Sequence, residues 1–373
     1  MSDTIRPSDS RTPITLLTGF LGSGKTTLLN GWLRDPALAD AAVIVNEFGD
    51  VGIDHDLIAA SSDNTIELST GCLCCTVRGD LVDTLRDLAD KRARGLVSRF
   101  SRVLIETTGL ADPAPVIQAL ITHPVAQAFR LGRVITVVDG VQGLETLERH
   151  VEARKQAAVA DEIVLTKTDL KPRALPALEA RLHELAPGAH LHLASLAAPP
   201  SAALLDGIDP YAPATKPADV MAWLRAEADA DAEAAAGAPA GDHGHGHDHG
   251  HSHSHGVHPH DTNRHSADIG SFSLLFDEPL HWEHVATWLD ALVVAHGPDL
   301  LRVKGILRIV GRDKPIVVQA VQTLFSPPAE LAAWPEGGQR SRIVFITKGL
   351  SRAFVTEVFD VIRTRPIPHA IAG

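Results

Sequence analysis

The feature that most constrains the fold is the glycine-rich segment GFLGSGKT at residues 19–26. An apolar run at 14–18 precedes it and a helical pattern follows, so it matches G-x-x-x-x-G-K-[ST] in its strand-turn-helix context. The glycines let backbone N–H groups surround a β-phosphate, and the Lys25 ammonium reaches the β and γ oxygens, which makes Lys25 a predicted catalytic residue. The motif predicts a nucleotide-binding P-loop whose Thr26 hydroxyl binds Mg²⁺. The predicted phosphate-binding residues are Gly22, Ser23, Gly24, Lys25, Thr26 and Thr27.

Short apolar runs alternate with helical stretches through the first half of the chain, a pattern typical of a parallel sheet with crossover helices. We therefore predict an α/β fold for residues 13–198, a P-loop NTPase domain with a mainly parallel sheet and flanking helices. A flexible N-terminus is expected at 1–12. The expected strands lie at 14–18, 42–45, 103–105, 134–138 and 163–165.

The composition changes near residue 199 to Ala, Pro, Gly and Asp. Such a stretch has too little apolar surface to offset an ordering entropy of roughly 1–2 kcal/mol per residue, so 199–268 is predicted to be a disordered linker. A smaller α+β domain is expected at 269–365, with helices over one face of its sheet, followed by a tail at 366–373. Its expected strands lie at 272–276, 301–310, 316–324 and 343–347, its helices at 282–295 and 351–363, and a tight turn at 311–313.

Charge and hydropathy argue against two classes of partner. The net charge of −12 over 373 residues suggests no clustered basic surface for nucleic acid. No apolar run reaches the roughly 18 residues that span a bilayer, and the polar N-terminus lacks the apolar core of a signal peptide. We expect a cytoplasmic protein that binds neither nucleic acid nor a membrane.

A further apolar run ends in an acid, VLIE at 103–106, and TTG follows it. P-loop proteins hold a carboxylate at this place, near Mg²⁺ and the attacking water, so Glu106 is the predicted catalytic carboxylate and Mg²⁺ ligand. Without the P-loop, an ordinary acid at a strand end would be the better interpretation. Residues 107–109 are predicted to sense the γ-phosphate, with Gly109 beside the nucleotide.

The segment TKTD at 166–169, after an apolar run, points to the base of the nucleotide. The Asp169 carboxylate can accept hydrogen bonds from guanine N1–H and N2–H₂, about 1.5–3 kcal/mol each, which adenine cannot donate. Alone such a string is often surface decoration, but its place in a P-loop domain predicts GTP. Thr166, Lys167 and Asp169 are the predicted base-binding residues.

All three cysteines lie at 72–75, in the sequence CLCC. Clustered thiols in a long chain favour a soft metal such as Zn²⁺ over a disulfide framework, although small buried residues or a redox site are the alternatives. Neighbouring side chains in a strand point to opposite faces, so both Cys74 and Cys75 bind only if the chain turns there. Three ligands are predicted, Cys72, Cys74 and Cys75, with Glu47 as the first choice for the fourth and Asp50 as the second.

A histidine-rich tract inside the predicted linker repeats an imidazole at every second position. Neutral imidazoles bind Zn, Ni, Co and Cu alike, so the tract is predicted to gather metal without selecting it; a merely solvated polar tract is the alternative. The residues concerned are His243, His245, His247, His249, His251, His253 and His255.

Together the motifs at 18–27, 46–54, 71–75 and 106–113 and the Lys167/Asp169 pair resemble those of the CobW-like P-loop GTPases, relatives of the accessory GTPases that deliver nickel to hydrogenase and urease. The resemblance implies GTP hydrolysis, a divalent metal at the cysteine motif, a switch segment near 47–54 and a CobW C-terminal domain. Members are described as zinc metallochaperones or cobalt handlers in cobalamin synthesis. The sequence that follows Glu106, with ADP at 111–113, is more similar to that of the zinc-linked members.

Two positions depart from the family pattern. Thr166 stands where an asparagine usually contacts the base and braces the P-loop, which predicts weaker nucleotide binding. Residues 321–323, VQT, stand where relatives often carry histidine, so a metal or partner role there is in doubt.

The predicted function is slow, metal-stimulated hydrolysis of GTP coupled to delivery of Zn²⁺ to an apo-metalloprotein client. Co²⁺ delivery for cobalamin synthesis is one alternative, because thiolates alone do not exclude cobalt. A metal storage or buffering protein with a structural nucleotide site is another. Assembly into an oligomer remains open.

Overall fold

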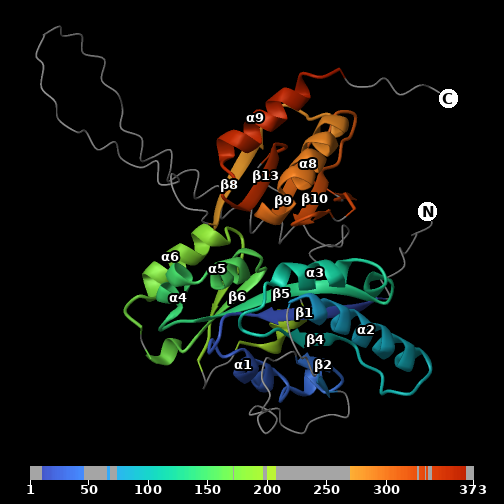
Figure 1. Cartoon of the computed structure of the whole chain (residues 1–373), viewed down its shortest axis with the longest axis vertical. Helices are drawn as coiled ribbons and strands as arrows, with labels where there is room; N and C mark the ends of the chain where they lie inside the picture. Colours follow the sequence, from blue (N-terminus) through green and yellow to red (C-terminus); the bar gives the residue numbers. More distant parts are fainter. Residues whose placement is uncertain are drawn as a thin grey trace, which may run out of the picture.

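Two domains, each built around one sheet, make up a computed structural model of the protein (Figure 1). The structure describes residues 11–45, 65–67, 74–170, 172–195, 200–206, 269–325, 327–331, 333–334 and 338–366, the side chains of 65–67 and 74–78 excepted. The predicted combination of an α/β domain and a smaller α+β domain is confirmed.

The larger sheet is parallel throughout its described strands, in the order β3-β2-β4-β1-β5-β6-β7. All five predicted strands form, and two more, β3 and β7, lie at the edges of the sheet, where the sequence lacks the continuous apolar run typical of a buried parallel strand. The strands are β1 (Thr12–Thr18), β2 (Ala42–Val45), β3 (Thr65–Glu67), β4 (Val103–Glu106), β5 (Phe129–Asp139), β6 (Glu162–Thr166) and β7 (His190–Leu193).

Helices cover both faces of this sheet because successive strand residues point to opposite sides. Leu16 and Ile105 pack toward α2 and α3, whereas Leu17 and Leu104 pack toward α1. Helices α4, α5 and α6 pack around the β6 residue Leu165. The helices are α1 (Lys25–Trp32), α2 (Cys74–Ala93), α3 (Pro113–Ile121), α4 (Gly143–Arg149), α5 (Val151–Ala158) and α6 (Leu175–Leu185), with short 3-10 turns η1 (Pro36–Leu38), η2 (Val125–Gln127), η3 (Thr168–Leu170) and η4 (Ala202–Asp206).

The C-terminal sheet is antiparallel, in the order β11-β10-β9-β13-β8, with β12 beside β10. Its two long helices pack on one face around Trp288, Phe345 and Phe359, as predicted. The elements are β8 (Ile269–Phe276), α8 (Trp282–His296), the 3-10 turn η5 (Gly297–Asp299), β9 (Leu300–Leu307), β10 (Ile316–Val321), β11 (Leu324–Phe325), β12 (Ala329–Glu330), β13 (Ser341–Lys348) and α9 (Arg352–Arg363).

Two predicted strands of this domain end too late. The strand predicted at 316–324 is a hairpin: β10 stops at Val321, Gln322 takes a left-handed conformation at φ 52°, and Leu324 pairs back with Val321. A two-residue turn of this kind requires such a backbone. The strand predicted at 301–310 ends at Leu307, although the turn after it forms with Gly311 at φ 77°.

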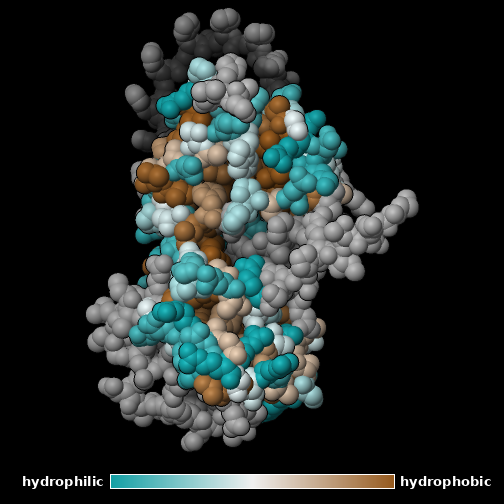
Figure 2. All heavy atoms as spheres, turned by 90° about the vertical axis from the view of Figure 1, so that its right-hand side faces the viewer, coloured by the Kyte–Doolittle hydropathy of each residue, from teal (hydrophilic) through white to brown (hydrophobic). Residues whose placement is uncertain are grey.

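The other face of the C-terminal sheet lies over α5, α6 and α3 of the first domain (Figure 1). Ile269, Leu301 and Ile346 join the apolar cluster of α5 and α6, and Val321 joins the cluster of α3. In the face shown in Figure 2, hydrophobic side chains reach the surface where the two domains meet. The two domains therefore share buried apolar contacts.

The first domain continues beyond residue 198. The Trp32 indole donates a hydrogen bond to the Pro200 carbonyl at 2.8 Å, and Ala202 and Leu205 are buried in the cluster beneath α1. The start of the predicted linker thus packs on the nucleotide-binding domain, while 207–268 lies outside the described residues. Within the described part of the chain, no helix is both long and apolar enough to cross a membrane.

Candidate nucleotide site and metal motif

The P-loop forms at the carboxyl end of β1 and leads into α1. Gly19, Gly22 and Gly24 have φ values of 144°, 70° and 95°, a backbone conformation that favours glycine. A Cβ at Gly19 would lie 2.2 Å from the Val137 carbonyl oxygen, so this position also has no room for a side chain. The Lys25 side chain is buried, and its ammonium donates to the Phe20 carbonyl at 3.2 Å across the loop.

The two predicted Mg²⁺ ligands come together. The Thr26 hydroxyl donates to Glu106 Oε1 at 2.7 Å, which joins the start of α1 to the end of the neighbouring strand β4. Ser23 lies three residues before Thr26, and Thr108 lies two residues after Glu106. The hydroxyls of Ser23 and Thr108 are buried, and neither has a hydrogen-bond partner among the described residues. A hydroxyl beside a carboxylate suits the hard oxygen coordination of Mg²⁺, and the two hydroxyls suit a phosphate.

The sensor loop, defined here as residues 107–112, leaves β4 and packs against the P-loop. Thr107 donates through its hydroxyl to Thr18 Oγ1 at 3.0 Å and through its backbone N–H to the Leu17 carbonyl at 3.0 Å. At Gly109 a Cβ would lie 2.7 Å from the Leu21 backbone nitrogen. Gly109 is therefore required for this close approach, a packing reason that the motif alone did not reveal.

The predicted base-binding segment also braces the P-loop. The Thr166 hydroxyl donates to the Ser23 carbonyl at 2.7 Å, and the Lys167 ammonium donates to the Gly22 carbonyl at 3.0 Å and to Asp139 at 2.5 Å. Thr166 therefore does reach the P-loop, while the weaker nucleotide binding expected from it stays a prediction. Asp169 lies exposed in η3, two residues after Lys167.

The metal motif is described only in part. Glu47, Asp50, Cys72 and the seven histidines of the tract lie outside the described residues. The backbone of Cys74 and Cys75 forms the start of α2, so the chain does turn at this pair, as binding by both thiols requires. Among the residues with described side chains, no group of three or more His, Cys, Asp or Glu is placed to hold a metal ion.

Helix α5 contributes a residue that sequence reasoning missed. Gln156 is completely buried, and its amide nitrogen donates to the carbonyls of Gly109 and Ala111 in the sensor loop, both at 3.1 Å. The signal was present, because Ala153, Gln156 and Ala157 follow the i, i+3, i+4 spacing of one helix face. A glutamine between alanines on the buried face of a helix indicates that its amide makes a polar contact in the core.

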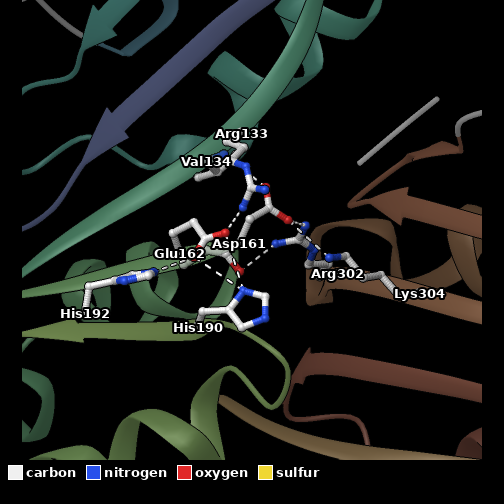
Figure 3. A network of polar contacts seen from close by, with 9 residues as sticks. Arg133, Val134, Asp161, Glu162, His190, His192, Arg302 and Lys304 are labelled. Carbon is white, nitrogen blue, oxygen red and sulfur yellow. Dashed lines mark hydrogen bonds and ion pairs between the residues drawn. The ribbon is translucent and has the colours of Figure 1, made fainter. Parts of the chain in front are cut away.

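A polar network at the amino ends of β6 and β7, beside the middle of β5, was also missed (Figure 3). Burial raises the pKa of Asp161, but the charges of Arg302 and Lys304 and a hydrogen bond from the Val134 backbone N–H outweigh it, so this pKa lies well below its usual range. Arg302 and Lys304 belong to β9, and Asp161 therefore links the two domains by ion pairs.

Beside Asp161, the buried Glu162 carboxylate pairs with Arg133 and accepts contacts from His190 at 3.4 Å and His192 at 2.8 Å. Burial lowers the pKa of His192, and the charges of His190 and Arg133 lower it further. Four residues of this network, Arg133, Glu162, His190 and His192, line a cavity of about 700 Å³. Both carboxylates, Asp161 and Glu162, therefore have partners on neighbouring strands.

Comparison with known proteins agrees with this architecture in both domains. Residues 13–192 match the family described as CobW/HypB/UreG, nucleotide-binding domain, and residues 269–363 match the cobalamin synthesis protein cobW C-terminal domain. The zinc chaperone YjiA of Escherichia coli is 31% identical over 353 residues, which is 94% of this chain and 98% of that protein. The zinc-regulated GTPase metalloprotein activator 1 of Schizosaccharomyces pombe is 33% identical over 167 residues, 42% of this chain and 39% of that protein.

A solved structure extends the likeness to the whole fold. The crystal structure of Zn(II)-bound YjiA GTPase from E. coli has a TM-score of 0.64 and 27% identity, and the match covers 95% of this chain and 99% of that one. The P-loop, the Thr26–Glu106 contact and both domain matches lead to one conclusion. The chain belongs to the CobW/HypB/UreG family and carries the CobW C-terminal domain.

Proposed function

We propose that this protein is a GTPase that binds Zn²⁺ at Cys72, Cys74 and Cys75 and transfers it to a client apo-metalloprotein. The observation that carries the proposal is a juxtaposition: Thr26 meets Glu106 at the carboxyl ends of β1 and β4, and only six residues separate the parallel strand β3 from Cys74 at the start of α2. Nucleotide and metal motifs thus follow strands that end at one edge of one sheet.

The described residues suit GTP binding and hydrolysis. Lys25 and the P-loop N–H groups hold the β and γ phosphates, Thr26 and Glu106 hold Mg²⁺, and Asp169 accepts hydrogen bonds from guanine. When bound there, Mg²⁺ neutralises charge on the β and γ oxygens. Thr166 and Lys167 keep the loop carbonyls of Ser23 and Gly22 turned away from the phosphates.

Zinc as the cargo is supported by the relatives, which are named zinc chaperones and a zinc-regulated GTPase metalloprotein activator. Turnover is proposed to be slow and to respond to metal, because the segment from β2 to α2 joins the nucleotide edge to the cysteines. A coupling of this kind typically changes affinity 5- to 150-fold, and it acts equally in both directions.

The test is a metal titration of the full-length chain with Mg-GTP analogue and with Mg-GDP, using wild type, Lys25→Ala and the three cysteine-to-alanine variants. We expect Zn²⁺ affinity to differ between the nucleotides in the wild type, and GTP turnover to be lost in Lys25→Ala. A competition series with Co²⁺ under Mg-GTP identifies the preferred metal. Equal Zn²⁺ affinity in both nucleotide states, or Zn²⁺ binding with no GTP turnover, would support storage instead.

A further inference from the structure

Helix α5 holds the sensor loop at three points. The Gln156 amide donates to the carbonyls of Gly109 and Ala111, and the Lys155 ammonium pairs with the Asp112 carboxylate at 2.5 Å. The Asp112 carboxylate also caps α3 by accepting from the Ala114 N–H at 3.1 Å. The loop between the catalytic carboxylate and α3 is therefore tied to α5 by side chains.

Gln156 is held firmly itself. It has no exposed surface, and its backbone carbonyl accepts a hydrogen bond from the Thr136 hydroxyl of β5 at 2.7 Å. Its side-chain oxygen is buried and has no hydrogen-bond partner among the described residues. Burying an amide with an unsatisfied acceptor is costly, so retaining it on a face of alanines calls for a reason other than packing.

The C-terminal domain grips the end of the same helix (Figure 3). The Arg302 guanidinium on β9 donates to the carbonyls of Val159 and Ala160, which directly follow α5, and pairs with Asp161. Lys304 contacts the same carboxylate at 3.1 Å. Only a few residues separate the carbonyls that Arg302 contacts from Gln156. A shift of β9 relative to β6 must therefore move α5 or break buried hydrogen bonds.

A second contact reaches the other side of the sensor loop. On α3, the Gln118 amide donates to Gln322 Oε1 at 3.2 Å and to Thr323 Oγ1 at 3.3 Å in the β10–β11 turn. The C-terminal domain thus contacts both helices that pack against the sensor loop. It contacts α3 through the β10–β11 turn and the end of α5 through Arg302. None of these residues belongs to the cysteine motif at 72–75.

We propose that Gln156 is a positioning residue for GTP hydrolysis and that the C-terminal domain holds it in place through Arg302. This rests on the proposed GTPase function. Gln156 fixes the positions of the Gly109 and Ala111 carbonyls, and hence the backbone of the sensor loop beside the γ-phosphate. Arg302 fixes the position of the carboxyl end of α5. A client that displaces the C-terminal domain would change the hydrolysis rate by the same route, and GTP would change the docking of that domain in return.

The test compares Gln156→Met and Arg302→Lys with Gln127→Met, a change at an exposed glutamine away from the loop. Single-turnover GTP hydrolysis, the affinities for GDP and for a GTP analogue, and the unfolding midpoint are measured on the full-length chain. We expect Gln156→Met to lower the hydrolysis rate about 10- to 100-fold with GDP affinity unchanged, because GDP has no γ-phosphate. Arg302→Lys should lower the rate about 5-fold, and the double variant less than the product of the two.

Two results overturn the proposal. A folded Gln156→Met that hydrolyses GTP at the wild-type rate removes the positioning role, and a folded Arg302→Lys at the wild-type rate removes the C-terminal domain from it. If Gln156→Met does not fold, Lys155→Met replaces it, because the Lys155–Asp112 pair is partly exposed. A wild type that binds but never hydrolyses GTP refutes the GTPase function. In that case, a ratio of GTP-analogue affinity to GDP affinity that falls in Gln156→Met but not in Gln127→Met still supports positioning of the loop by Gln156, and an unchanged ratio refutes it.

Discussion

Buried polar groups are treated in opposite ways at the two ends of the parallel strands, called here the carboxyl edge and the amino edge of the sheet. At the carboxyl edge, the Ser23 and Thr108 hydroxyls lack partners within the described structure, and glycines bring the loops close. At the amino edge, Asp161 and Glu162 are surrounded by cations, imidazoles and an N–H group.

Unsatisfied buried groups are costly, so an edge that keeps them is arranged for a ligand, whereas an edge that pairs them is arranged for the protein itself. The carboxyl edge binds a nucleotide in our proposal, and the amino edge fastens the C-terminal domain. Substitutions at the two edges should therefore give different kinds of defect.

The largest effect is expected at the amino edge. Asp161→Ala leaves Arg302 and Lys304 without their carboxylate in a buried interface, and breaking such a pair costs about 3–5 kcal/mol of unfolding free energy. Chemical denaturation measures it. Since the pKa of Asp161 is lowered on folding, its contribution is complete above the unfolded value of 3.8 and is lost as the pH falls through the lower folded value. A variant as stable as wild type at pH 7 would show that the interface holds without this pair.

A smaller effect is expected at the carboxyl edge. Thr166→Val keeps the side-chain shape but removes the hydrogen bond to the Ser23 carbonyl, which is worth about 0.5–1.5 kcal/mol. GDP affinity should fall about 3- to 10-fold with little change in stability, as measured by calorimetry. Thr356→Val, which loses a similar hydrogen bond on α9, is the matched control. Unchanged GDP affinity would mean that Thr166 braces the loop without helping the nucleotide.

The smallest effect concerns acid sensitivity at the amino edge. The pKa of His192 is lowered on folding by burial and by the charges of His190 and Arg133, so the unfolded chain binds a proton more readily. Stability is therefore complete above pH 6.5 and decreases as the pH falls from 6.5 toward the folded pKa. His192→Asn should flatten this slope in denaturation at pH 5 to 7, and the exposed His123→Asn should leave it. A slope that persists in His192→Asn assigns it to another group.

Much of the carboxyl edge could be predicted because its information is local. The P-loop occupies eight consecutive residues, and the Glu106 and Thr166 segments each follow an apolar strand, so strand order alone brings them together. In the structure, the Thr26 hydroxyl lies 2.7 Å from Glu106 Oε1. The edge strand β7, with the sequence HLHL, lacks the continuous apolar run by which the central strands are recognised.

The amino edge could not be predicted because its partners are distant in the chain. Asp161 and Arg302 are 141 residues apart, and only the packing of β9 on α5 unites them. Gln118 and Gln322 are 204 residues apart, and the latter lies in a turn that the apolar pattern concealed. Local patterns find motifs, whereas domain contacts depend on the tertiary fold.

Helix α2 begins at Cys74 and runs for twenty residues, and this placement has a consequence for how a metal could leave. Leu81, Leu85 and Leu88 anchor the helix in the core, whereas its first turn precedes the first of these buried contacts. The ends of a helix fray at far lower free energy than its packed middle. A metal bound by Cys74 and Cys75, as proposed, would be held at the end of a helix, so its release would call for less local unfolding than release from the packed middle of α2.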